Sequence, residues 1–236
     1  MSNVWTIGRH EFTSYFRLPA AYVVLAVFLA VTGYLFTLFL LLTREANLQH
    51  LFRSMGIVLV FLVPALTMRL VAEEKRSGTL DLLLACPLRD WELVLGTDLG
   101  SLSDTAVLLL STVHYRFILI DMVRPDNVPI AIGYLGALLL MGVFLAVGLW
   151  ASTLTQSQVV AYVAAFGVVL LFWALDGLGN YAGGGFADLL TFVALSRHYD
   201  DFTRGILDSR HIVYYLSWVV FFLVLSSRSL SFRKWL

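Results

Sequence analysis

Residues 73–96 read EEKRSGTLDLLLACPLRDWELVLG, a charged stretch that separates two long apolar runs. A helix needs about 20 apolar residues to cross the hydrocarbon core of a membrane. The flanking runs, at about 51–71 and 93–119, meet this requirement. A charged insert between two membrane spans lies in water, where a soluble protein can reach it. We therefore interpret the stretch as a contact site for a partner outside the membrane.

The composition of the whole chain is that of a membrane protein. Of its 236 residues, 59% are hydrophobic and only 14% are charged, whereas a soluble domain has about 25% charged residues. The mean hydropathy is +0.83. The formal net charge is zero, so the chain has no general attraction to nucleic acid, and we expect no nucleic-acid partner. The lone Cys86 cannot form an intrachain disulfide.

The apolar runs predict an all-α integral membrane protein with six transmembrane helices in a single domain, residues 1–236. The first run is 25 residues long, whereas the apolar part of a signal peptide has about 7–15, so we expect it to be retained as a span. The predicted spans are about 18–42, 51–71, 93–119, 130–151, 158–176 and 212–227.

The distribution of basic residues predicts the orientation. An even number of spans places both termini on one side of the membrane. If that side is cytoplasmic, nine Lys and Arg fall inside and seven outside, and the inside set clusters near span ends. Basic residues close to span ends favour the cytoplasmic side. We therefore predict that both termini and the 73–92 insert are cytoplasmic.

Two further segments predict helices that do not span the membrane. Residues 3–17 have a helical rhythm in which Trp5, Phe12 and Phe16 can share one face. This pattern is typical of an amphipathic helix at the membrane interface; a short helix packed on protein is the alternative. On the outer side, the connection 177–211 has an apolar middle, 187–195, that is too short to cross and suits a re-entrant or surface-lying helix.

Within the insert, the residues predict a helix, a sharp turn and a second short helix. Glu73 to Arg76 continue the second span into water, and Ser77-Gly78 breaks that helix. A hydroxyl of Ser77 or Thr79 can cap the next helix, and Pro87 ends it. The apolar surface of this helix comes from Leu80, Leu82, Leu83 and Leu84. Asp90 is then expected to cap the third span, with Glu92 in its first turn.

The third span carries acidic residues where an ordinary span is apolar. Asp98 lies near its inner end and can stay hydrated, whereas Asp104 lies deeper. Six residues correspond to about 600° of helix rotation, so the two carboxylates do not share one face. Asp104, with Asp98 as a second candidate, is the residue to consider for a translocation path or a proton-linked site. The favoured interpretation is that Asp104 pairs with Ser, Thr or a water inside the bundle, since polar groups in spans often serve packing.

The outer connection also contains histidine and aspartate, but no catalytic residue or metal site is predicted there. The residues concerned are His198, Asp200, Asp201 and His211. Their spacing matches no standard set of metal ligands. Ion pairs within a charged segment that includes Arg197 and Arg204 are the favoured interpretation.

The insert also resembles a known signature. The run EEKRSGTLDLLL at 73–84, Pro87, and WELVLG at 91–96 are similar to the signature of ABC-2 type transporter permeases. The likeness is strongest to the bacterial subgroup that includes the gliding-motility-associated permease. The run GLWASTLTQSQ at 148–158 resembles the tight turn that this family has between its fourth and fifth spans. The resemblance implies six spans and a location in the bacterial cytoplasmic membrane.

The resemblance also implies partners. Such permeases pair as homodimers or heterodimers, and each half docks on a cytoplasmic ATP-binding subunit through a coupling helix after the second span. An auxiliary subunit on the outer side is a further expected partner, beside membrane lipid. ATP and Mg would be held by the ATP-binding subunit; this sequence has no Gly-x-x-x-x-Gly-Lys-Ser/Thr loop. The coupling residues implied here are Glu73, Glu74, Lys75, Arg76, Gly78, Thr79, Leu80 and Leu83.

We therefore expect the non-catalytic permease subunit of an ATP-binding-cassette transporter, an exporter that moves substrate by alternating access. Two alternatives stay open: a proton-coupled secondary transporter that uses Asp104, and a membrane-embedded enzyme that uses Asp104 or the outer His and Asp residues. Neither alternative explains the charged insert. The sequence does not identify the substrate.

Overall fold

The computed structural model describes residues 2–17, 19–43, 48–78, 89–120, 126–181 and 185–233, and the regular structure in these ranges is helical. Six stretches are long and apolar enough to cross a membrane, which confirms the predicted all-α fold with six spans. They are Ala21–Leu42, Gln49–Ser77, Trp91–Leu119, Asn127–Leu154, Gln158–Gly179 and Ser209–Ser231.

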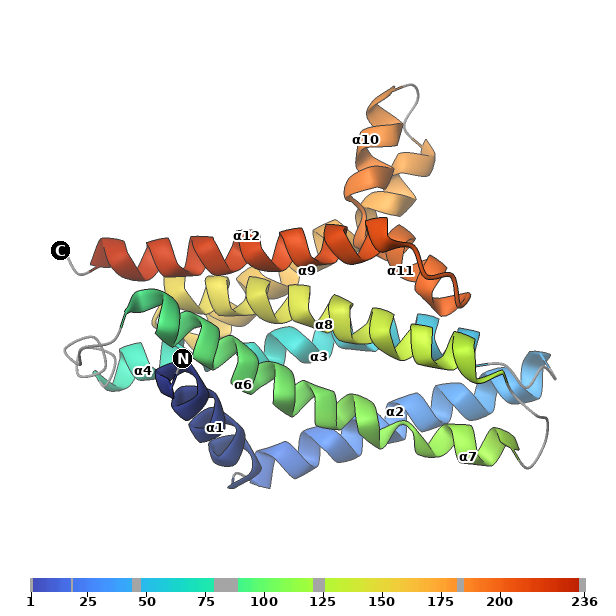
Figure 1. Cartoon of the computed structure of the whole chain (residues 1–236), viewed down its shortest axis with the longest axis horizontal. Helices are drawn as coiled ribbons and strands as arrows, with labels where there is room; N and C mark the ends of the chain where they lie inside the picture. Colours follow the sequence, from blue (N-terminus) through green and yellow to red (C-terminus); the bar gives the residue numbers. More distant parts are fainter. Residues whose placement is uncertain are drawn as a thin grey trace.

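The spans lie side by side in one bundle (Figure 1). The helices, in chain order, are α1 (Ser2–Arg17), α2 (Pro19–Thr43), α3 (Gln49–Thr67), α4 (Ala72–Ser77), α6 (Asp90–Ser111), α7 (His114–Ile120), α8 (Asn127–Leu154), α9 (Gln158–Tyr181), α10 (Gly185–Val193), α11 (Leu195–Thr203) and α12 (Ser209–Arg233). Both termini and α4 lie at one end of the bundle, which we call the terminal end. The opposite end, with α7 and α11, is the distal end.

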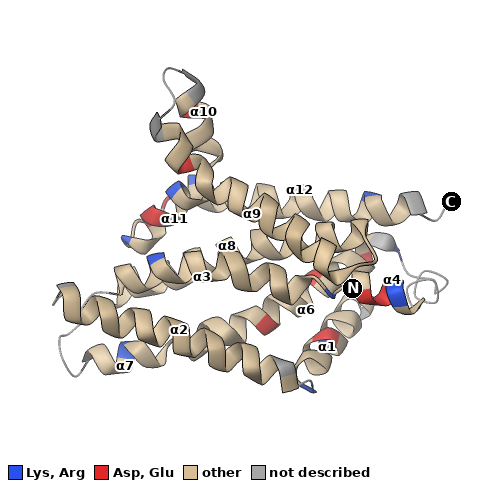
Figure 2. Ribbon diagram, turned by 180° about the vertical axis from the view of Figure 1, so that it is seen from behind, with Lys and Arg blue, Asp and Glu red and all other residues tan. Residues whose placement is uncertain are grey.

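Helix α8 is the centre of the bundle. It packs against α3, α6, α9, α11 and α12. In the most apolar window of its span 61% of the residues are buried, against 17% in those of α2, α9 and α12. The outer helices therefore present apolar side chains to their surroundings. Charged residues are few along the spans and more frequent at the terminal end and around α11 (Figure 2).

Three glycines of α8 let its neighbours approach its backbone. A Cβ at Gly133 would lie 2.5 Å from the Phe52 ring, and one at Gly148 would overlap the Thr67 side chain. A Cβ at Gly136 would overlap Phe202 of α11. These three glycines are close-packing positions. A Cβ at Gly142 would lie 3.6 Å from the Val219 side chain, an ordinary van der Waals distance.

Two spans that the sequence predicts as continuous are interrupted. The second span ends as α3 at Thr67 and resumes as α4 at Ala72. The third span ends as α6 at Ser111 and resumes as α7 at His114. At the second break, the Thr112 hydroxyl lies 2.6 Å from the Leu109 carbonyl oxygen and 3.1 Å from the Tyr134 hydroxyl. These bonds supply partners for polar groups at the break, which hydrophobic periodicity alone does not reveal.

Helix α1 packs on the first half of α6. A Cβ at Gly8 would lie 3.2 Å from the Gly96 carbonyl oxygen, and one at Gly100 would lie 3.0 Å from the Gly8 carbonyl oxygen. Trp5, in contrast, is 75% exposed. The predicted amphipathic helix therefore exists and packs on protein along one face. Its place at a membrane interface stays a prediction.

The connection between α9 and α12 contains two short helices. The apolar stretch predicted at 187–195 is largely α10, which projects from the bundle beyond α12 (Figure 1). Helix α11 returns to the bundle and is anchored by Tyr199, whose hydroxyl donates to the Phe52 carbonyl at 2.9 Å.

The close approach at Gly148 leads to a stability prediction. Gly148→Ala is expected to lower the free energy of unfolding by about 1–3 kcal/mol, because the new methyl group must displace Thr67. Gly167→Ala on α9 is the control, because a Cβ there meets nothing within 4 Å. It is expected to be neutral or to stabilise by up to about 1 kcal/mol. Thermal unfolding of the purified chain measures both, and equal midpoints would contradict the packing described.

Candidate functional site

The charged insert begins with α4, and one side chain of α8 fixes where α4 starts. The Ser152 hydroxyl accepts hydrogen bonds from the backbone N–H groups of Val71 (3.0 Å) and Ala72 (2.9 Å). It also lies 3.3 Å from the Met68 carbonyl oxygen, to which it donates. A hydroxyl has one proton and two lone pairs, so Ser152 uses its full capacity to close the gap between α3 and α4. Ser152 is fully buried.

A second contact joins α4 to the end of α8. The Lys75 ammonium group donates to the Thr153 carbonyl. The side chains of Glu73 and Arg76 are exposed on α4. Gly78 has a left-handed φ of 76° and its N–H bonds to the Lys75 carbonyl, so it ends the helix. The predicted break at Ser77-Gly78 is confirmed. The helix is therefore an exposed charged element on a fixed base.

The remaining predicted coupling residues lie outside the described residues. They are Thr79, Leu80 and Leu83, together with Leu82, Leu84, Cys86 and Pro87. The second short helix of the insert thus stays a prediction.

The start of α6 differs from the expectation. Arg89, not Asp90, is the N-cap residue, and Asp90 is already the first helical residue. The Glu92 carboxylate accepts from the Arg89 N–H at 3.1 Å and from the Asn3 amide at 3.4 Å. The first turn of α6 is therefore capped by Glu92, which also links α6 to α1.

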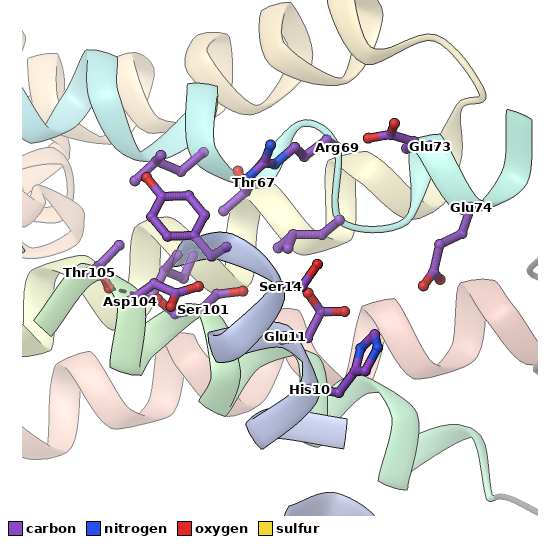
Figure 3. A pocket seen from close by; sticks show the side chains of 14 residues that line it. His10, Glu11, Ser14, Thr67, Arg69, Glu73, Glu74, Ser101, Asp104 and Thr105 are labelled. Carbon is purple, nitrogen blue, oxygen red and sulfur yellow. Dashed lines mark hydrogen bonds between the residues drawn. The ribbon is translucent and has the colours of Figure 1, made fainter. Parts of the chain in front are cut away.

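Between α1, the α3–α4 junction and α6 lies a cavity of about 210 Å³ (Figure 3). Asp104 reaches it from α6, Glu11 from α1 and Arg69 from the turn between α3 and α4. Its lining comprises His10, Glu11, Ser14, Tyr15, Leu66, Thr67, Arg69, Leu70, Glu73, Glu74, Ser101, Asp104, Thr105 and Leu145. We call it the junction cavity. It connects the exposed helix α4 with the acidic residue that the sequence singled out.

Asp104 lies in the junction cavity without a hydrogen-bond partner. Asp104 is only 7% exposed, and its Oδ1 atom is buried and makes no hydrogen bond. The Tyr15 hydroxyl is buried and unbonded in the same way. That Asp104 belongs to a translocation path or a proton-linked site stays a prediction, and pairing of its Oδ1 atom with a bundle hydroxyl is not seen.

The junction cavity is lined by more carboxyl groups than basic groups. The Arg69 guanidinium stacks over the Tyr15 ring, 5.3 Å from the ring centre. Burial raises the pKa of Glu11 above its ordinary value, and the nearby positive charges of His10 and Arg69 oppose this shift. The cavity therefore brings carboxyl groups from three elements together around one guanidinium.

Asp98 is buried on the same helix but does not line the junction cavity. It is 6% exposed, and its Oδ1 atom is likewise unbonded. The expectation that Asp98 and Asp104 do not share one helix face agrees with this arrangement. Asp98 has no described part in the cavity.

Sequence reasoning missed three residues of the site: Glu11, Arg69 and Ser152. A signal existed for one side of the cavity, because Ser101, Asp104 and Thr105 have the i, i+3, i+4 spacing of a polar stripe. The sequence contains no comparable signal for Glu11 and Arg69, which look like ordinary charged residues near span ends. Ser152 lies 80 residues from the N–H group of Ala72 that it binds.

The histidines and aspartates of the distal end contact side chains of other helices and of their own segment. Asp201 Oδ2 lies 3.0 Å from His211 Nε2, and Asp200 lies 3.7 Å from Arg53 of α3. His198 stacks on Tyr214 with ring centres 4.0 Å apart. The partners are thus Arg53 and His211 rather than the neighbouring arginines of the same segment. Within the described ranges, no group of three or more His, Cys, Asp or Glu side chains could hold a metal ion.

Comparison with known proteins identifies one family. The model of a family described as ABC-2 family transporter protein matches residues 43–179, more than half of the chain. The matched region starts before α3 and ends in α9, so it includes α4, α6 and α8. No curated protein matches the chain.

The buried histidine of the distal end predicts a pH effect. Burial lowers the pKa of His198 below its ordinary value of 6.5, although a hydrogen bond to the Ala194 carbonyl opposes the shift. The unfolded chain then binds a proton more readily than the folded chain, so stability is lost as the pH falls through this pKa. Between about pH 7.5 and pH 5, we expect the thermal midpoint to fall further in the wild type than in His198→Phe.

His114→Phe is the control, because the His114 ring also lies next to a tyrosine, with ring centres 4.0 Å apart and the rings tilted by 45°, but is exposed. It is expected to keep the pH dependence of the wild type. A His198→Phe variant with an unchanged pH slope would contradict the assignment.

Proposed function

Because the chain belongs to the ABC-2 family of transporter membrane proteins, we propose that it is the permease subunit that couples ATP hydrolysis on a separate subunit to the export of a substrate. The family match covers the charged insert and the central helix. The observation that carries the coupling role is the anchoring of α4 to α8 through Ser152 and Lys75.

The anchoring supports a route for mechanical force. A partner that moves α4 acts on the buried end of α8 through Ser152 and Thr153. Helix α8 contacts α3, α6, α9, α11 and α12, and a close-packed interior transmits displacement because it has little free volume. A loop attached only at its ends would lose such a displacement. A docking element fixed to the core is therefore suited to receive a motion made by another chain.

We place the terminal end in the cytoplasm. Both termini and α4 lie there (Figure 1), and the basic residues nearest the span ends favour the cytoplasmic side. A cytoplasmic ATP-binding subunit would then meet Glu73, Arg76 and the segment that follows Gly78. That subunit would hold ATP and Mg and carry out the hydrolysis.

A second permease, as homodimer or heterodimer, would complete the transporter. Helices α3 and α9 are neighbours, with the Phe61 and Phe166 ring centres 5.0 Å apart. Their outward side chains, including Ile57 of α3 and Val163 of α9, are at least 50% exposed. This apolar surface supports a dimer contact at the second and fifth spans. An outer auxiliary subunit and the gliding-motility subgroup remain expectations from the sequence resemblance.

The proton-coupled alternative has one supporting observation, the unbonded carboxylate oxygen of Asp104 in the junction cavity. It would make transport independent of an ATP-binding subunit. The docking experiment below separates the two proposals, because a secondary transporter has no need to bind such a subunit.

Charge reversal on α4 tests docking. Glu73→Arg and Arg76→Glu are expected to weaken binding of the ATP-binding subunit at least about tenfold, since each reverses an exposed charge at the proposed contact. Co-purification from membranes and titration of the purified subunit measure the loss. Arg204→Glu, exposed at the distal end, is the control and is expected to bind normally. Undiminished binding by both α4 variants would refute docking at α4.

Loss of the Ser152 hydroxyl tests transmission separately from docking. Ser152→Ala leaves two buried N–H groups without a partner, at about 1–3 kcal/mol each. We expect the ATP-binding subunit still to bind, while the change in its ATPase rate on binding the permease is reduced. Ser157→Ala is the control, because Ser157 is exposed and its only described hydrogen bonds use backbone atoms. Full ATPase modulation by Ser152→Ala would contradict the proposed route.

A further inference from the structure

We propose that the junction cavity binds a primary ammonium group, with the Asp104 carboxylate as its counter-ion. The proposed coupling role does not require a ligand at this place. The site therefore adds a binding function to the one proposed above, and it is defined by the chemistry of the cavity wall.

The first step of the argument is the state of Asp104. Asp104 is only 7% exposed, and its Oδ1 atom has no hydrogen-bond partner. Leaving such an acceptor unpaired costs free energy, more so when it is charged. The side chain faces a cavity that is large enough for a small organic group (Figure 3). A cation in the cavity would offset the charge of this carboxylate.

The second step is that three hydroxyl groups of the wall have already used their protons. Thr67 donates to the Val63 carbonyl, Ser101 to the Thr97 carbonyl and Thr105 to the Ser101 carbonyl. Each of these hydroxyls therefore offers only lone pairs to the cavity. Together with the carboxylates they supply many acceptors, whereas the donors of the wall include the unbonded Tyr15 hydroxyl and the Arg69 guanidinium.

The third step is the charge balance. Four carboxyl groups line the cavity, those of Glu11, Glu73, Glu74 and Asp104, against the guanidinium of Arg69 and the imidazole of His10. Among the described residues, no ion pair within 4.0 Å joins Arg69 to a carboxylate, and the guanidinium is stacked on Tyr15 instead. The wall therefore favours a cation that brings its own N–H donors.

An ammonium group meets these requirements better than a metal ion. It has three donors and no acceptor, so one carboxylate and two hydroxyl lone pairs can satisfy it. A bare metal ion needs several anionic or imidazole ligands together, and no such group of three is found among the described residues.

Two sources could supply this group: the amine of an aminophospholipid headgroup, or a free amine from solution. Helix α1, which forms one wall, is expected at the membrane interface where headgroups lie. Glu73 and Glu74 of α4 line the same cavity, so occupancy and the position of α4 are thermodynamically linked.

The experiment uses the full chain in nanodiscs of phosphatidylcholine, whose headgroup has no N–H donor. Ethylammonium chloride is titrated while thermal unfolding is followed, with tetramethylammonium chloride at the same concentrations as the control. We expect a saturable rise of the midpoint with ethylammonium only, because ligand binding to the folded state stabilises it. No saturable rise, or equal rises with both salts, would overturn the proposal and leave a cavity that holds water.

Two variants locate the site. Asp104→Asn is expected to weaken the ethylammonium response about ten- to a hundred-fold, as loss of a charge-assisted hydrogen bond does. Asp98→Asn is the matched control, with an equally buried acid on the same helix outside the cavity, and should respond like the wild type. If Asp104→Asn does not fold, Glu11→Gln on α1 takes its place with a weaker response in the same direction. Equal losses in Asp98→Asn would overturn the assignment.

A second set of nanodiscs distinguishes the sources. If the site takes a headgroup, adding phosphatidylethanolamine raises the wild-type midpoint, suppresses the ethylammonium response and has neither effect on Asp104→Asn. If the site takes a free amine, the lipid changes nothing and the ethylammonium response persists. Both outcomes support the ammonium site. A lipid effect of equal size in Asp104→Asn would count against it.

Discussion

The requirement that buried backbone groups be hydrogen-bonded controls the terminal end of this protein. Inside a packed bundle, an N–H group at the end of a helix needs a protein partner because water does not reach it. Here the second span stops at Thr67, and a single hydroxyl from α8, that of Ser152, supplies what the missing helical turn would have supplied. The N–H groups of Val71 and Ala72 therefore have a partner where α4 leaves the axis of α3. The start of α4 is fixed to the core through Ser152, and Lys75 adds a contact with the end of α8.

The packing of α8 explains why this anchor is rigid. Its glycines receive side chains from α3 and α11 at backbone distance, and its middle residues, from Leu140 to Val147, are almost completely buried. Its many small and apolar residues allow α3, α4, α6, α9, α11 and α12 to pack against it at once. The same contacts fix α3 and α6, which form two walls of the junction cavity, while α1 forms the third.

Much of the fold was predictable because its signals are local. Twenty-residue apolar runs determine spans, and the break at Gly78 follows from the glycine after a charged helix turn. The breaks after Thr67 and Ser111 could not be predicted, since they depend on hydroxyl contacts between residues far apart in sequence. Only one side of the cavity could be predicted. The polar stripe of α6 can be recognised in the sequence, whereas Glu11 and Arg69, which also line the cavity, come from other elements.

The contact between Gly148 and Thr67 has a consequence for sequence change over time. The two positions share one volume, so neither can grow without the other shrinking. An alanine at the first position would place its Cβ 2.6 Å from the Cβ of Thr67, so a related chain with that alanine would need glycine at the second position or a wider separation of the two helices. Thr67 is also the last residue of α3. Co-variation at this pair would therefore mark how closely the helix carrying the docking element can approach the central helix in each member of the lineage.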